Sequence, residues 1–168
     1  MTSHVSPSSE LVDRRPLGEA KAAALDRARG LPRLVLDRNQ VLDLEKIADG
    51  TFSPLTGFMG SRDYRAVVDD GRLADGRPWT IPVVLQFPDE TADRFRAGGD
   101  VLLWNGEEDR PSGVMSVAEV FRMDLMDSAA KIYATTERKH PGVDRWLSGG
   151  TSALAGPITL LERSTSLI

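Results

Sequence analysis

The stretch DLEKIADGTFSPLTGFMG, residues 43–60, passes from one backbone pattern to another near its middle. Its first half carries apolar residues at helical spacing up to Gly50, which predicts a short helix. Its second half fits neither the helical nor the strand period, because Pro54 restricts the residue before it to extended conformations and two glycines permit positive φ. Two Phe, a Leu and a Met are too apolar for an exposed loop. Residues 51–60 are therefore expected to form an irregular loop whose side chains fill a core.

The residues before this stretch predict a tail, a helix and a strand. Residues 1–12 are rich in Ser and lack apolar periodicity, so we expect a flexible N-terminal tail. Apolar residues at helical spacing between Pro16 and Gly30 predict the first helix, and the short apolar run 33–36 predicts a strand.

The residues after it favour short strands separated by turns and short helices. Ser61 is the predicted N-cap of a helix that ends at Gly71. Further strands are expected at 80–87, 101–105, 113–122 and 157–161, and further helices at 89–96, 124–134 and 143–147. Strands without regular long helices between them argue against a doubly wound parallel sheet. The expected fold is α+β, a small β-barrel decorated with short helices, over residues 13–163, with a C-terminal tail at 164–168.

The composition excludes several kinds of site. The chain of 168 residues has no Cys, which removes disulfides, thiolate metal sites and cysteine nucleophiles and fits a reducing compartment. Its formal net charge of −4 disfavours a nucleic-acid surface. No run approaches the roughly 20 apolar residues of a membrane span, and no export signal is visible. We therefore expect a soluble cytoplasmic protein with no membrane partner.

No pattern of catalytic residues stands out. Neither a G-x-G-x-x-G nor a G-x-x-x-x-G-K-[ST] loop occurs, and the Gly-Gly-Thr-Ser run at 149–152 is expected to be a turn. His140 precedes Pro141 and Gly142, so we expect its ring to bond a backbone group of a turn, although a catalytic triad through it stays open because triads are set by space. Asp43 and Glu45, two apart on a helix, do not share a face. The sequence thus predicts no catalytic, cofactor-binding or metal-binding residue.

Residues 43–59 closely resemble the signature DLE-x-I-x-x-G-x-FSPLTGFM of ATP sulfurylases (sulfate adenylyltransferases). The stretches RLADG at 72–76, WTIPVVL at 79–85 and HPGV at 140–143 resemble further family motifs in the same order, and the resemblance runs from about residue 11 to 161. The signature residues, for which we expect structural roles, are Asp43, Leu44, Glu45, Phe52, Ser53, Pro54, Leu55, Gly57, Phe58, Met59, His140, Pro141, Gly142 and Val143.

The resemblance implies the N-terminal domain of that family, a PUA-like β-barrel with helical additions. The family's catalytic domain carries a Q-x-R-N-x-x-H motif, whereas the Arg38-Asn39 pair here has Leu36 and Leu42 where Gln and His would stand. The implied function is an accessory domain of sulfate activation that is inactive alone and needs no cofactor. Its implied partner is a separately encoded catalytic domain or a sulfurylase subunit.

Two alternatives remain at this point. Related barrels bind structured RNA, so a PUA-like RNA-binding module is one alternative, although the acidic net charge counts against it. A truncated sulfurylase without a function of its own is the other.

Overall fold

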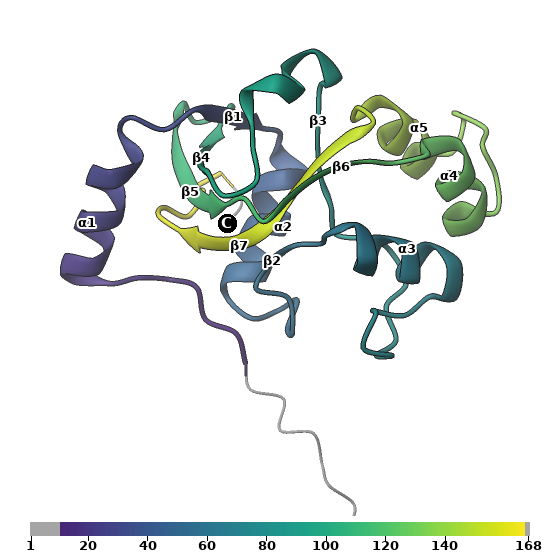
Figure 1. Ribbon diagram of the computed structural model, residues 1–168, viewed down its shortest axis with the longest axis horizontal. Coiled ribbons are helices and arrows are strands. Elements are labelled where there is room, and N and C mark those ends of the chain that lie inside the picture. The colour runs from purple at the N-terminus through teal and green to yellow at the C-terminus, as the bar shows by residue number, and fades with distance from the viewer. Residues whose placement is uncertain (1–10, 167–168) are drawn as a thin grey trace, which may run out of the picture.

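A computed structural model describes residues 11–166, and one long strand, β7 (Ser152–Leu160), runs through the centre of its sheet (Figure 1). All partners of β7 are antiparallel to it. These partners are β2 (Gly57–Phe58), β3 (Leu85–Phe87), β5 (Arg110–Ser116) and β6 (Glu119–Arg122). β3 and β6 pair with the same residues of β7, so they lie along opposite edges of it. β2 and β5 also lie on opposite edges of β7.

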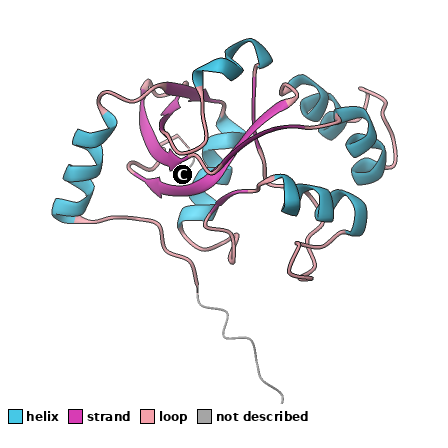
Figure 2. Cartoon of the chain, in the orientation of Figure 1, coloured by secondary structure: helices cyan, strands magenta, loops and turns pink. Residues whose placement is uncertain are grey.

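The remaining strands extend the sheet beyond β5. β4 (Asp100–Asn105) pairs antiparallel with β5, and β1 (Arg33–Leu36) pairs parallel with β4. The order β1-β4-β5-β7-β2 describes a mixed sheet that curls into a half-barrel with helices around it (Figure 2). The expected α+β class with a curled sheet is confirmed, and the sheet stays open rather than closing into a full barrel.

Two glycines allow close backbone packing along β7, one where the loop of residues 51–60 pairs with it and one where it passes Ser116. A Cβ atom on Gly57 would lie 1.7 Å from the carbonyl oxygen of Gly156, and a Cβ on Gly156 would lie 2.0 Å from that of Ser116. Gly156 also has a φ of +152°, which L side chains rarely adopt. A side chain at Gly57 would therefore force the loop away from β7, and one at Gly156 would force β7 away from Ser116.

The helices begin and end at local signals. α2 (Arg38–Ala48) begins with a capping box between Asp37 and Gln40 and buries one face in the core. α3 (Ser61–Asp70) ends at Gly71, which has φ +64°. The others are α1 (Gly18–Ala28), the 3₁₀ helix η1 (Asp89–Arg94), α4 (Leu125–Tyr133) and α5 (Pro141–Ser148).

α1 lies to one side of the sheet and is attached by small residues (Figure 1). Ala24 and Ala28 pack with Leu102 and Leu161 in a small cluster separate from the main core. Its other residues are mostly exposed, so little apolar area holds this helix in place.

Several predicted boundaries are wrong. The strand expected at 80–87 covers only 85–87, because Pro82 has no N–H for a ladder. The strand expected at 113–122 is divided into β5 and β6 opposite Gly156, and the helix expected at 89–96 is the shorter η1. The N-cap of α3 is Gly60 rather than Ser61, and the Ser61 N–H donates to Glu119 Oε2 at 3.0 Å.

The last strand is longer than predicted, and parts of both chain ends lie outside the described residues. β7 starts at Ser152 instead of 157, with the Gly-Gly turn just before it. Residues 1–10 of the expected N-terminal tail and residues 167–168 lie outside the described part of the chain.

A buried hydrogen bond joins α4 to α5. Trp146 Nε1 donates to Ser128 Oγ at 2.8 Å, and Ser128 is fully buried. The Trp146 ring stacks on Tyr64 of α3 at 6.4 Å between centroids, and Tyr64 contacts Phe121 of β6. The three helices at this end are thus held to β6 through one aromatic cluster.

We expect Ser128→Ala to lower the free energy of unfolding by about 1–3 kcal/mol, because it leaves the buried Trp146 N–H without an acceptor. Urea denaturation followed by tryptophan fluorescence measures this change. Ser116→Ala, at an exposed serine, is the matched control and should cost less than about 0.5 kcal/mol. Equal losses in the two variants would contradict the importance of the buried bond.

Candidate functional site

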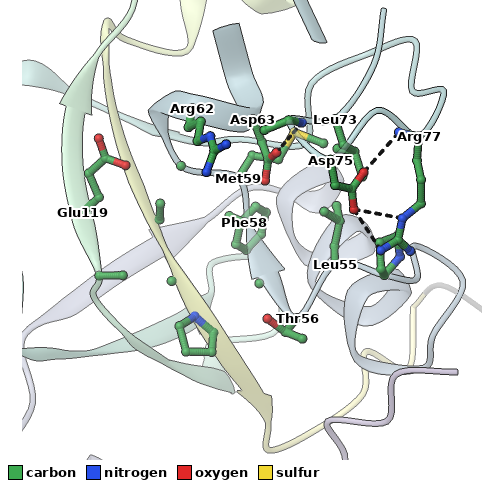
Figure 3. Close-up of a pocket in the computed structure, with 18 residues that line it drawn as sticks. Leu55, Thr56, Phe58, Met59, Arg62, Asp63, Leu73, Asp75, Arg77 and Glu119 are labelled. Carbon is green, nitrogen blue, oxygen red and sulfur yellow. Dashed lines mark hydrogen bonds and ion pairs between the residues drawn. The ribbon is translucent and has the colours of Figure 1, made fainter. Parts of the chain in front are cut away.

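The signature loop forms one wall of an open cavity of about 530 Å³ (Figure 3). Residues 54–60 line this wall, and the 73–77 turn, the start of α3 and the β6–β7 contact line the rest. Leu55, Phe58 and Met59 are buried beneath it, so the loop does fill the core as predicted. We call this cavity the loop pocket. Its volume lies within the range of about 300–1,000 Å³ that is usual for ligand sites.

Most charges around the loop pocket are already engaged. Asp63 Oδ1 accepts the Ala74 N–H at 2.9 Å, and Asp75 forms an ion pair with Arg77 at 2.8 Å. Glu119 caps the N-terminus of α3, where a carboxylate is favoured by the helix dipole. Arg62 is the exception, since it makes no hydrogen bond or ion pair within residues 11–166. The pocket therefore offers a recess with one free guanidinium.

No metal site is found in the described residues. Between residues 11 and 166 there is no group of three His, Asp or Glu side chains that could hold a metal ion. The carboxylates of the loop pocket instead accept backbone N–H groups or pair with arginine.

Most signature residues hold the fold together. Leu44 is fully buried in the core, and Ser53 Oγ donates to the Gly50 carbonyl while accepting the Val12 N–H. Glu45 lies on another face of α2 and accepts the Ser164 N–H at 2.6 Å. Asp43 and Glu45 thus have separate surroundings, as their spacing predicted.

His140 is the N-cap of α5. Its Nδ1 accepts the N–H groups of Gly142 at 3.1 Å and Val143 at 3.3 Å, and its ring packs on Tyr133. Pro141 occupies the first position of the helix, where a missing N–H costs nothing, and Val143 is buried. The ring nitrogen that faces the helix is therefore an acceptor already in use.

Glu108 binds the segment predicted to be a C-terminal tail. Its Oε1 accepts the Ser164 hydroxyl and the N–H groups of Thr165 and Ser166, and Arg110 pairs with its other oxygen. The Ser164 hydroxyl and the Ser166 N–H hold the pKa of Glu108 well below its usual range. Residues 164–166 are thus fixed to the β4–β5 turn by one carboxylate.

Asp43, unlike the signature residues described above, makes no contact that explains its place in the fold. Its half-buried side chain makes no hydrogen bond or ion pair within residues 11–166. Burial raises its pKa to about 6, and the positive charge of Lys46 opposes that rise. A carboxylate kept charged and unpaired in such surroundings costs stability, and such groups cluster at functional sites. The sequence marked Asp43 only as part of a motif.

None of the helices between residues 11 and 166 is long and apolar enough to cross a membrane.

Comparisons with known proteins give one family match and a set of relatives that share one name. The sequence matches the PUA-like domain family over residues 4–163. It is 45% identical over 164 residues to the sulfate adenylyltransferase of Symbiobacterium thermophilum and 41% identical over 154 residues to that of Synechococcus elongatus. These matches cover 97% and 92% of this chain but 42% and 39% of the relatives. The chain therefore spans about two fifths of their length.

A solved structure titled "Hexameric APS kinase from Thiobacillus denitrificans" has a similar fold. Its TM-score is 0.68 at 25% identity, and the match covers 92% of this chain and 26% of that one.

The pKa of Asp43 predicts an unusual pH dependence of stability. The folded state holds this proton more tightly than the unfolded chain, in which the pKa is about 3.9. Its contribution to stability is thus full below about pH 4 and is lost as the pH rises through 6. We expect Asp43→Asn to raise the free energy of unfolding at pH 7.5 by about 1–3 kcal/mol, and by much less at pH 4.5.

Urea denaturation at both pH values measures this difference. The control is Asp70→Asn, at an exposed carboxylate on α3, for which we expect little change at either pH. A loss of stability in Asp43→Asn at pH 7.5 would show that Asp43 has a stabilising partner.

Proposed function

The chain belongs to the PUA-like domain family, and from that premise we propose that it is the PUA-like accessory part of a sulfate adenylyltransferase. The observation that carries this proposal is the match of nearly the whole chain to proteins of that name, at 45% identity over 97% of its length. We further propose that it works in the cytoplasm, in keeping with a sequence that has no Cys.

We propose that the adenylyl transfer itself is carried by residues outside this chain. Joining sulfate to a nucleotide requires several donors or cations around a triphosphate and a sulfate together, where negative charge gathers. In the loop pocket, Arg77 is paired with Asp75 and Arg62 stands with the carboxylates of Asp63 and Glu119 nearby. This arrangement supports a binding role better than an adenylyl-transfer role. The working partner is then a catalytic region in the same polypeptide or in a separate one.

We expect the purified 168-residue chain to release no pyrophosphate from ATP, Mg²⁺ and sulfate above a buffer blank. A coupled pyrophosphate assay measures this, with the full-length Symbiobacterium thermophilum enzyme as the active control. Sulfate-dependent turnover by the chain alone would refute the accessory role.

A chimera tests the positive side of the proposal. When this chain replaces the matching 42% of the Symbiobacterium thermophilum enzyme, we expect sulfate-dependent pyrophosphate release to be retained, because 45% identity preserves the fold and its contacts. The same enzyme without that region is the negative control. A chimera that melts cooperatively yet has no activity would contradict the proposal.

A further inference from the structure

A second hollow lies between α2, residues 78–84 and the corner where α4 leads to α5. It consists of two adjoining cavities of about 600 and 150 Å³ that share Asp43, Ile81, Pro82, Tyr133 and Arg145. None of its lining residues lines the loop pocket. We call it the aromatic groove.

The apolar wall of the aromatic groove is rigid before anything binds. The rings of Phe52 and Trp79 meet edge to face at 5.8 Å, and Trp79 Nε1 donates to the Ile81 carbonyl at 2.9 Å. The Ile81 side chain beside them is 51% exposed, although it is large and apolar. Fixed aromatic side chains and exposed aliphatic ones are typical of the centre of an interface, since little entropy is lost when they are covered.

The groove also holds one negative and one positive charge without partners. Asp43 and Arg145 both line it, and neither makes a hydrogen bond or ion pair with another described residue. Each is close enough to influence the other, but their separation exceeds that of an ion pair. The folded chain alone gains nothing from an unpaired, half-buried carboxylate, whereas a binding partner that brings a cation would.

The surface has another apolar hollow, beside Met126, whose cations, unlike Arg145 in the aromatic groove, already have partners. Met126 is 55% exposed beside Leu125 and Leu147, but the cations there are engaged: Arg138 pairs with Asp144 at 2.8 Å, and Arg122 bonds Thr151. Met126 therefore serves as a matched reference for Ile81, with similar exposure on a different part of the surface.

We propose that the aromatic groove binds an extended polypeptide segment of the sulfate adenylyltransferase that lies outside these 168 residues. The segment places an aliphatic or proline side chain against Phe52, Trp79 and Ile81, a basic side chain on Asp43 and an acidic one on Arg145. The identity of this occupant rests on the proposed function.

Two observations favour this occupant. About three fifths of the relatives' length lies outside the match, so such segments exist in those enzymes. The groove carries opposite charges close together, which suits a short stretch of mixed charge and disfavours a nucleic acid, whose backbone has one sign of charge.

The experiment uses short overlapping synthetic peptides that cover the part of the Symbiobacterium thermophilum enzyme outside the match. Each fluorescent peptide is titrated with the full 168-residue chain, and anisotropy reports binding. We expect at least one peptide to bind, and Ile81→Asp, Asp43→Asn and Arg145→Glu each to weaken it about tenfold or more. Met126→Asp should leave its affinity unchanged. Thermal melts of each variant confirm that it is folded; Ile81 and Arg145 are exposed, so their replacement should not disturb the core.

Binding should also depend on pH through Asp43. The charged groups around it are Lys46 of α2, Asp37 at the N-cap of α2 and Arg145 of α5, and Tyr133 lines the same cavity from α4. We expect the wild-type affinity to fall between pH 7.5 and 5.5 as Asp43 takes up a proton, and the affinity of Asp43→Asn to stay constant over that range.

Three results would overturn the proposal. One is that no peptide binds, and another is that Met126→Asp weakens binding as much as Ile81→Asp does. The third is a dimer of the chain alone, seen by sedimentation velocity and abolished by Ile81→Asp, because a second copy would then occupy the groove. An active chimera together with no peptide binding would reject the groove while leaving the proposed function intact.

Discussion

The backbone of Gly57 lies so close to that of Gly156 that Gly57 has no room for a Cβ atom, and Ser116 leaves no room for one at Gly156. The contact between the two glycines fixes the signature loop onto β7, and β7 in turn pairs with β2, β3, β5 and β6. The start of β7 is held just as firmly, because Asp89 accepts both the N–H and the hydroxyl of Ser152. The Ser152 and Thr151 hydroxyls lower the pKa of Asp89 to about 2. Two walls of the loop pocket, the signature loop and the β6–β7 contact, therefore depend on the position of one strand.

Elements with local signals could be predicted from the sequence. Asp124 and Gly71 mark helix ends within a few residues of the turns they stabilise, and the Asp37–Gln40 capping box is an equally local signal that our prediction did not include. β7 could not be found at full length, because Gly156 and Pro157 inside it normally indicate a break. Glu119 caps α3 from 58 residues away, and no pattern near Ser61 indicates such a partner.

The two candidate sites, the loop pocket and the aromatic groove, differ in how far apart in the sequence their residues lie. The loop pocket takes one wall from the continuous signature loop, which the sequence analysis predicted as a core-filling loop and not as the wall of a pocket. The aromatic groove takes Asp43, Ile81 and Arg145 from segments far apart in the chain, and only the fold brings them together. Packing accounts for Leu44, Phe58 and Met59, and capping accounts for His140. What packing leaves unexplained is the unpaired charge of Asp43, and that charge was visible only once its neighbours were known.

The grip of Glu108 on residues 164–166 has a practical consequence for anyone labelling this protein. A dye or spin probe attached at position 166 would sit on a backbone segment that is held in place, because the N–H groups of Thr165 and Ser166 and the Ser164 hydroxyl are all bound to one carboxylate. The backbone that carries it would turn with the whole domain, so only rotation about the probe's own linker bonds would add local motion. With no natural Cys in the sequence, a single introduced thiol at this position would carry that label without competition.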